Sequence, residues 1–345
     1  MTTEAVLITG GAGFIGSNLT HRLLGEGHQV TIFDNFSRSG CQSNMAWLHE
    51  THGQERLHLV QADLKAFDAL KEAAAGARRI YHLAGQVAVT TSVQNPRQDF
   101  EDNALGTFNA LEAARLVGDD PIFIYASTNK VYGGMEDLSI VEQNSRYGYA
   151  DLPLGVSEKR PLDFHSPYGC SKGAGDQYVR DYARIYGLRS VVLRQSCIYG
   201  YRQFGIEDQG WIAWFIIAAL KQRPLSIYGD GKQVRDVLFI DDLLDAYEAA
   251  CQRIGSVKGE VFNIGGGAQN TMSIWAEFGP LLEELLGRPL PVTFADWRPG
   301  DQRVYVSDIR KAESLLGWRP QVGVREGVTR LFRWIEANQS LFDHL

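Results

Sequence analysis

Residues 5–16 decide the fold of this chain, and they read Ala5-Val6-Leu7-Ile8-Thr9-Gly10-Gly11-Ala12-Gly13-Phe14-Ile15-Gly16. The apolar run predicts a short buried strand, and the glycines follow it at once, before an amphipathic segment that reaches about Leu24. A second strand over 29–34 ends in Asp34. Strand, glycine turn, helix and acidic strand end within one βαβ unit are typical of a dinucleotide site. Glycines let the backbone approach a pyrophosphate at a helix N-terminus, where amide donors favour an anion.

Asp34 carries the prediction of which dinucleotide is bound. Its carboxylate would accept hydrogen bonds from the ribose hydroxyls and repel a 2′-phosphate, which favours NAD over NADP. Arg38 lies close by in the sequence, and its positive charge would favour a 2′-phosphate and therefore NADP. The alternative interpretation of Asp34 is a polar strand end with no role in cofactor binding.

The βαβ pattern then repeats. We expect a third strand over 57–60 that leads to Asp63 on the adenine side, and a fourth strand over 79–85, with helices at about 67–75 and 102–117. His82 is interpreted as a packed core histidine. The predicted cofactor site comprises Gly10, Gly13, Phe14, Ile15, Gly16, Asp34, Asn35, Ser37, Arg38, Asp63, Leu64, Leu83, Ala84, Gly85, Tyr168 and Lys172.

Fifth and sixth strands over 122–128 and 190–194 complete an alternation typical of a doubly wound parallel sheet, a Rossmann-type α/β fold. From about Gln195 the alternation becomes less regular. We predict an NAD-binding domain of residues 1–194 plus 232–265. A smaller, discontinuous substrate domain would hold residues 195–231 plus 266–345.

Tyr168 and Lys172 follow Pro167, a residue suited to a helix entrance, and their i, i+4 spacing places them on one helical face. A lysine beside a phenol favours the phenolate, so Tyr168 is a candidate base. A hydroxyl at the end of the fifth strand is expected beside this pair. Either Thr128 or Ser127 could supply it, and the spacing back from Val131-Tyr132-Gly133 favours Thr128. Each signal alone is weak, because exposed Tyr/Lys pairs and capping hydroxyls are common.

Composition excludes several classes of protein. The net charge of −7 and the absence of a basic block argue against a nucleic-acid or anionic-membrane binder. The N-terminus has no basic segment before its apolar run, so neither a signal peptide nor a membrane span is expected, and a cytoplasmic location is favoured. Four cysteines, at 41, 170, 197 and 251, lack metal-ligand spacing. We therefore expect reduced thiols and no metal site.

Taken in order, these residues resemble the extended short-chain dehydrogenase/reductase family, specifically its nucleotide-sugar epimerases and dehydratases, over essentially the whole chain. Gly10, Gly13 and Gly16 match the family's GxxGxxG, and Thr128, Tyr168 and Lys172 match its catalytic triad. The resemblance implies tightly held NAD, a nucleotide-sugar substrate and a homodimer through the 102–117 and 168–186 helices.

The stretches at 83–88, 127–133, 164–172 and 208–211 look like those of the CDP-tyvelose (CDP-paratose) 2-epimerases. This likeness implies transient oxidation and re-reduction of a CDP-3,6-dideoxyhexose at C2. Segments around Arg235 and around Arg298-Pro299-Gly300-Asp301 resemble those that hold the diphosphate and ribose, and arginine suits phosphate oxygens. The predicted substrate site is Gln86, Thr128, Asn129, Lys130, His165, Cys197, Gln203, Arg235, Arg298 and Asp301.

Two departures bear on the reaction. Many relatives have asparagine where this chain has Cys197, so a substrate-facing amide is missing there. The 4,6-dehydratases place Asp-Glu after the catalytic threonine, whereas this chain has Asn129-Lys130, which disfavours dehydration. A UDP-hexose or UDP-uronate 4-epimerase is the main enzymatic alternative, and a catalytically silent NAD-binding regulator is the alternative from another class.

Overall fold

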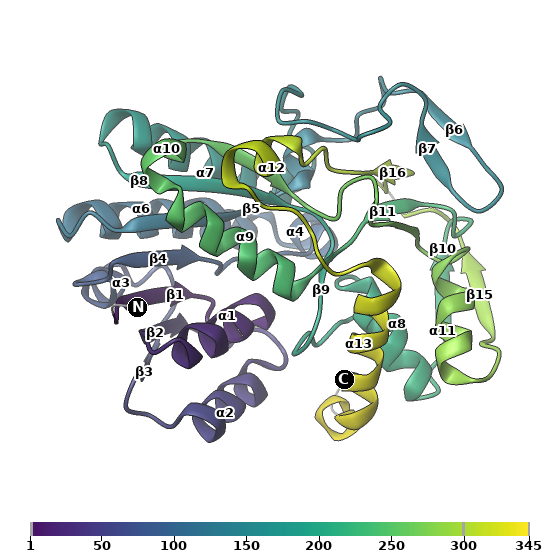
Figure 1. The fold of residues 1–345 in the computed structure, drawn as a ribbon, viewed down its shortest axis with the longest axis horizontal. Helices are drawn as coiled ribbons and strands as arrows, with labels where there is room; N and C mark the ends of the chain where they lie inside the picture. The colour runs from purple at the N-terminus through teal and green to yellow at the C-terminus, as the bar shows by residue number, and fades with distance from the viewer. Residues whose placement is uncertain (1–2, 299–300, 344–345) are drawn as a thin grey trace. The chain divides into compact units, whose positions relative to one another are not determined.

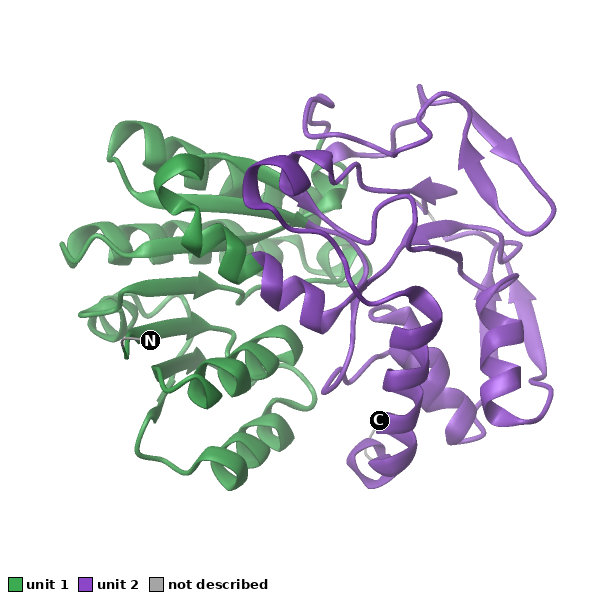
Figure 2. Cartoon of the chain, viewed as in Figure 1, with its two compact units in different colours: residues 1–131, 164–194, 247–262 green, residues 132–163, 195–246, 263–345 purple. Residues whose placement is uncertain are grey.

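A computed structural model describes residues 3–298 and 301–343, and their contacts divide the chain into two compact units (Figure 2). Unit 1 contains residues 1–131, 164–194 and 247–262. Unit 2 contains 132–163, 195–246 and 263–345. The chain therefore leaves and re-enters each unit. The predicted boundaries differ from this division at 132–163, 232–246 and 263–265, which belong to unit 2 by their contacts.

A seven-stranded sheet in the order β13-β8-β5-β4-β1-β2-β3 forms the centre of unit 1 (Figure 1). The pairs β1–β2, β2–β3, β1–β4 and β4–β5 are parallel. Its strands are β1 (Ala5–Thr9), β2 (Gln29–Asp34), β3 (Leu57–Gln61), β4 (Arg79–His82), β5 (Ile122–Thr128), β8 (Arg189–Gln195) and β13 (Val261–Ile264). The strand order reverses between β1 and β4. In such sheets ligands bind outside the carboxyl ends at this switch point.

Helices cover both faces of the sheet, which confirms the doubly wound fold. Helices α3, α6 and α7 share an apolar cluster with sheet residues such as Leu7, Phe33 and Phe123, and α1 and α2 pack together on the other face (Figure 1). The unit 1 helices are α1 (Phe14–Gly25), α2 (Cys41–His52), α3 (Phe67–Ala74), α4 (Val89–Gln94), α5 (Pro96–Phe100), π-helix η1 (Glu101–Leu105), α6 (Gly106–Leu116), α7 (Ser166–Ile185) and α10 (Ile254–Val257). The 3₁₀ turn η2 (Asn129–Tyr132) and helix α9 (Ile240–Gln252) cross the division between the units.

Three local expectations need correction. The helix expected over 102–117 begins as the π-helix η1 and becomes α-helical only from Gly106. The fourth strand ends at His82, not at residue 85. Helix α2, whose sequence has only weak amphipathic periodicity, was not predicted; it follows Gly40, whose φ of 85° turns the chain into the helix.

Unit 2 is built from small sheets with helices beside them, which accounts for the irregular sequence pattern after residue 195. Its strands are β6 (Ile140–Glu142), β7 (Tyr147–Tyr149), β9 (Ile198–Tyr199), β10 (Leu225–Tyr228), β11 (Val234–Asp236), β12 (Leu238–Phe239), β14 (Thr271–Ser273), β15 (Val292–Ala295) and β16 (Val304–Tyr305). Its helices are α8 (Trp211–Leu220), α11 (Phe278–Leu286), α12 (Arg310–Leu316), α13 (Val324–Ala337) and η3 (Gln339–Phe342). Within the described residues, no helix combines the length and apolarity that a membrane span requires.

Candidate active site

The glycine turn connects β1 to α1 and leaves no room for side chains. A Cβ on Gly16 would lie 2.2 Å from the Gly10 carbonyl oxygen and 2.6 Å from the Gly11 Cα. Helix α1 has no side-chain cap at Gly13 and no acidic residue in its first turn. Its N-terminal amides therefore face no competing negative charge from the helix itself. This combination of close backbone and uncapped helix suits a pyrophosphate.

Asp34 ends β2 beside this turn and is 8% exposed. One carboxylate oxygen accepts from the Ala12 amide at 3.0 Å and the other from the Phe36 amide at 2.8 Å. Two of the roughly four acceptor sites of the carboxylate are thereby used, and the others can accept hydroxyl donors. Burial raises the pKa of Asp34, while the two amide bonds lower it.

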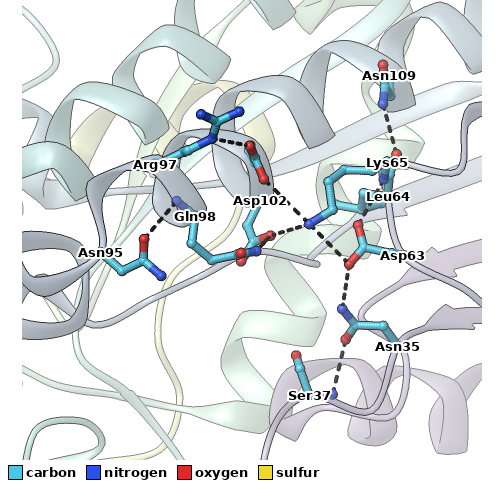
Figure 3. A network of polar contacts seen from close by, with 11 residues as sticks. Asn35, Ser37, Asp63, Leu64, Lys65, Asn95, Arg97, Gln98, Asp102 and Asn109 are labelled. Atoms are coloured by element: carbon cyan, nitrogen blue, oxygen red, sulfur yellow. Dashed lines mark hydrogen bonds and ion pairs between the residues drawn. The ribbon is translucent and has the colours of Figure 1, made fainter.

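The residues predicted to lie on the adenine side of the cofactor form a network of polar contacts (Figure 3). Asn35 donates to Asp63 at 3.0 Å, and the Ser37 amide donates to Asn35 at 3.1 Å. Lys65 links Asp63, at 3.7 Å, to Asp102, at 3.8 Å. The Leu64 carbonyl accepts from Asn109 at 2.9 Å. The loop after β3 is thus tied to η1 and α6, which fixes the backbone of residues 63 and 64.

The predicted cofactor residues at the ends of β1 and β4 lie against each other. A Cβ on Gly10 would lie 2.8 Å from the Ala84 amide nitrogen, so the ends of β1 and β4 are in close contact. The amides of Leu83 and Ala84 donate to the Thr9 carbonyl and hydroxyl, at 3.1 and 3.3 Å. All the residues predicted to hold NAD lie in unit 1.

Thr128, Tyr168 and Lys172 also lie in unit 1, and all three are buried. The Thr128 hydroxyl oxygen accepts from the Lys130 amide at 3.2 Å and lies 3.3 Å from the Asn129 amide oxygen. A hydrogen bond from Thr128 lowers the pKa of Tyr168. Thr128 and Tyr168 are thus in direct contact.

Lys172 does not act on Tyr168 in the expected way in the protein alone. Burial raises the pKa of Tyr168 to about 12, with Asp99 raising it further and the Arg38 charge lowering it. The lowering expected from the sequence is therefore outweighed by desolvation. The Lys172 ammonium lies 4.4 Å from the centroid of the Tyr125 ring. Burial lowers the pKa of Lys172 to about 7, against the charges of Asp176 and Asp99, which raise it.

The sequence predicted Lys172 but gave no signal for the groups around it. Asp99, on α5, is 1% exposed and accepts from Ser171 at 2.6 Å and from Asn103 at 3.1 Å. Asn103 lies in the π-helix, a conformation common at functional sites. His82 is fully buried, with its ring nitrogens 2.8 and 3.0 Å from the hydroxyls of Thr9 and Thr107, so its interpretation as a core histidine is confirmed.

The predicted substrate residues divide between the units. Gln86, Asn129, Lys130 and His165 lie in unit 1; Cys197, Gln203, Arg235, Arg298 and Asp301 lie in unit 2. Gln86 donates to the Ala88 carbonyl at 2.6 Å, and its buried amide oxygen has no hydrogen-bond partner among the described residues. His165 is exposed and occupies the N-cap position of α7 without a side-chain cap.

In unit 2, carboxylates hold both predicted phosphate-binding arginines. Arg235 donates to Asp301 at 2.7 Å. Arg298 lies over the Tyr228 ring, 3.9 Å from its centroid, and 3.2 Å from a carboxylate oxygen of Asp208. Gln203 donates to the Ile198 carbonyl at 3.3 Å. Pro299 and Gly300 of the predicted Arg298–Asp301 segment lie outside the described residues.

The fold is that of a Rossmann-type protein, and the comparisons with known proteins specify its class. A family model described as GDP-mannose 4,6 dehydratase matches residues 7–331. The chain is 44% identical over 336 residues to a CDP-paratose 2-epimerase of Salmonella typhi, which covers 95% of this chain and 98% of the relative. It therefore belongs to the NAD-dependent epimerase/dehydratase family of extended short-chain dehydrogenases/reductases, and it is an enzyme of the nucleotide-sugar epimerase class.

Two solved structures are similar along their whole lengths. UDP-glucose 4-epimerase of Thermotoga maritima has a TM-score of 0.83 and 29% identity, with 97% of this chain and 99% of that chain covered. UDP-glucuronic acid 4-epimerase of Bacillus cereus, in complex with UDP-glucuronic acid and NAD, has a TM-score of 0.81 and 30% identity, with the same coverage.

Proposed function

We propose that this enzyme epimerises the C2 carbon of a CDP-linked 3,6-dideoxyhexose by transient oxidation and re-reduction with bound NAD. The similarity to a CDP-paratose 2-epimerase, at 44% identity over 95% of the chain, carries this proposal. The contact between Thr128 and Tyr168 and the burial of Lys172 support it, because an oxidation of this kind would use a hydrogen-bonded hydroxyl pair beside a lysine.

The residues of unit 1 fit NAD. The backbone around Gly16 is packed too closely to admit a side chain there, as a turn that lets a pyrophosphate approach the helix N-terminus requires. The glycine turn and the start of α1 would hold the pyrophosphate, Asp34 the ribose hydroxyls, and the loop of Asp63 and Leu64 the adenine. When bound, NAD supplies the hydride acceptor and donor. The carboxylate of Asp34 would repel a 2′-phosphate, which favours NAD over NADP.

Tyr168 would take the proton from the sugar hydroxyl and later return it, while Thr128 would hydrogen-bond the same oxygen. Because burial raises the pKa of Tyr168 to about 12, the phenolate needs more positive charge than the protein alone supplies. Lys172 would hold the nicotinamide ribose, which would bring the positive charge of the oxidised cofactor close to the phenol. The diphosphate would be gripped by Arg235 and Arg298, so that binding energy falls on the part of the substrate that does not react.

A UDP-hexose or UDP-uronate 4-epimerase is the second candidate, favoured by the two similar solved structures. Such an enzyme would use the same triad. Dehydration is disfavoured, because Asn129 and Lys130 replace the acid/base carboxylates that a dehydratase needs at these positions. A catalytically silent NAD-binding regulator would not require Thr128, Tyr168 and Lys172. The presence of all three residues therefore disfavours this alternative.

Incubation with CDP-paratose, CDP-tyvelose, UDP-glucose and UDP-glucuronate, followed by NMR of the sugar, decides between the candidates. We expect interconversion of the two CDP-sugars. Deuterium placed at C2 of the sugar should remain there, since hydride returns to the carbon it left. Inversion at C4 of a UDP-sugar with both CDP-sugars unchanged would rule out the 2-epimerase, and loss of the deuterium to water would rule out the oxidative route.

We also propose that the enzyme is a cytoplasmic homodimer. Apolar side chains on α6 and α7 remain exposed, among them Phe108, Tyr178 and Ile185. Phe108 and Tyr178 pack edge to face across the two helices, with ring centroids 6.0 Å apart. A second copy would cover this surface, and sedimentation of the Tyr178→Glu variant as a monomer would support the proposal.

A further inference from the structure

Behind the catalytic helix, one buried carboxylate joins three elements of unit 1. Asp176, on α7, accepts from Arg194 Nε at 2.8 Å and from Arg194 Nη2 at 2.9 Å. Its Oδ2 also accepts from the Ser127 hydroxyl at 2.8 Å. Exposure is 0% for Asp176, 2% for Arg194 and 4% for Ser127. Such a bidentate pair fixes orientation as well as charge.

Two members of this network are close in sequence to residues of the proposed active site. Ser127 directly precedes Thr128 at the end of β5, and Asp176 follows Lys172 by one turn of α7. Arg194 comes from β8. Further along α7, a Cβ on Gly175 would lie 2.5 Å from the Tyr125 hydroxyl, which shows how closely the helix approaches β5. The carboxylate of Asp176 therefore sets where the helix sits along the strand.

Lys172 needs negative charge nearby, because its ammonium is buried. The groups that face it are Asp176 on its own helix, Asp99 on α5, the Tyr125 ring on β5 and His82 on β4. His82 is neutral at physiological pH, since burial and the Lys172 charge lower its pKa to about 3. Asp176 and Asp99 are therefore the charges that favour the ammonium, and the bidentate pair with Arg194 fixes the orientation of the Asp176 carboxylate.

We propose that Asp176, held by Arg194 and Ser127, is a positioning residue that keeps the Lys172 side chain charged and in register with Thr128. This inference rests on the proposed function, because it supposes that Lys172 and Thr128 act in one reaction. Asp176 itself does not touch the substrate. The simpler alternative is an ion pair that stabilises the fold and has no effect on Lys172.

The variants are chosen to separate these two roles. Asp176→Asn removes the charge and keeps a hydrogen-bonding group; it leaves Arg194 buried without a counter-charge, which is destabilising. The double variant Asp176→Asn with Arg194→Gln therefore serves if the single variant fails to fold. Ser127→Ala removes only the link to β5. Glu248→Gln is the matched control, since Glu248 forms a partly buried pair with Arg79 at 2.7 Å at the opposite end of β4.

With the nucleotide sugar that the wild-type enzyme turns over, Asp176→Asn should lower kcat about tenfold to a hundredfold and leave KM nearly unchanged. The alkaline limb of the kcat profile should move down by about one pH unit, because the Lys172 ammonium loses an opposite charge. Ser127→Ala should lower kcat without moving the limb. Glu248→Gln should lower the melting temperature but change neither kcat nor the position of the alkaline limb.

A second readout does not depend on any substrate. The protein is labelled with carbon-13 at the lysine ε-carbons, and the Lys172 signal is identified by its absence in Lys172→Met. In Asp176→Asn, or in the double variant, this signal should titrate at lower pH than in the wild type. A Lys172 titration identical to that of the wild type overturns the proposal. If the wild type turns over no nucleotide sugar, the proposed function fails, and the titration still decides whether Asp176 controls Lys172.

Discussion

Arg235 donates a hydrogen bond to Asp301 at 2.7 Å, so two residues predicted to bind the substrate hold each other within unit 2. Arg235 is 7% exposed, and its guanidinium also donates to the Val234 carbonyl at 2.8 Å. The guanidinium fork is thus oriented before any ligand binds. An arginine fixed in this way loses little conformational entropy when it receives a phosphate.

We expect Arg235→Gln to raise KM for the nucleotide sugar about 10- to 100-fold, with a smaller effect on kcat, because hydrogen bonds to charged groups contribute about 1.5–3 kcal/mol. Steady-state kinetics checks this. Arg310→Gln is the control, since Arg310 pairs with Asp308 in the same unit but is 67% exposed. An unchanged KM in Arg235→Gln would remove this residue from the phosphate site.

Tyr168→Phe should reduce turnover by about 10²–10⁴-fold, the range for loss of a general acid/base. NAD should remain bound, because the ring is kept and the glycine turn is untouched. Absorbance of the NAD released on denaturation measures its occupancy. Turnover like that of the wild type would exclude Tyr168 as the base.

Gly16→Ala should abolish NAD binding, since its Cβ would lie 2.2 Å from the Gly10 carbonyl oxygen and force the turn apart. Gly25→Ala offers a matched control at the other end of α1, where a Cβ would meet nothing within 4 Å. Isothermal titration calorimetry with NAD measures the affinity of both variants. Equal affinity in the two variants would contradict the assignment of the turn to the pyrophosphate.

His82 should make the enzyme sensitive to acid. Its pKa is about 3 in the folded chain, against 6.5 for an unperturbed histidine, so the unfolded state binds the extra proton between these values. The wild type should therefore lose about 1 kcal/mol of stability per pH unit through this residue as the pH falls below 6.5.

His82→Gln retains groups able to bond Thr9 and Thr107 but cannot take up the proton. Its deficit in unfolding free energy at pH 7 should shrink at pH 5, as measured by urea denaturation at both values. A deficit that stays constant with pH would show that His82 does not titrate in this range.

Cys197 should tolerate asparagine better than valine. Its backbone φ of 37° is in the left-handed region, where asparagine is favoured over other residues with a Cβ and β-branched residues are strained. Cys197→Asn should therefore leave the melting temperature unchanged or higher. Cys197→Val should cost about 1–2 kcal/mol in the free energy of unfolding. Equal losses in both variants would show that backbone conformation is not what limits this position.

Much of unit 1 was predictable from the sequence. Parallel strands that are buried on both faces have short, continuous apolar sequences, and a glycine turn between such a strand and a helix indicates a dinucleotide site. The bounds of β1, β2 and β5 agree with prediction to the residue. Unit 2 was less predictable, since its strands are two to four residues long, too short for a periodic pattern to register.

The sequence by itself determined the dinucleotide turn, the acidic end of β2 and the Tyr168–Lys172 spacing on one helix, because each depends on residues close together in the chain. Only the tertiary structure decided the electrostatics of the site. Asp99, Asp176 and Arg194 lie on three separate elements and surround or support Lys172 in a buried environment. Burial raises the pKa of Tyr168 and lowers that of Lys172, and desolvation depends on what the whole fold places around a group.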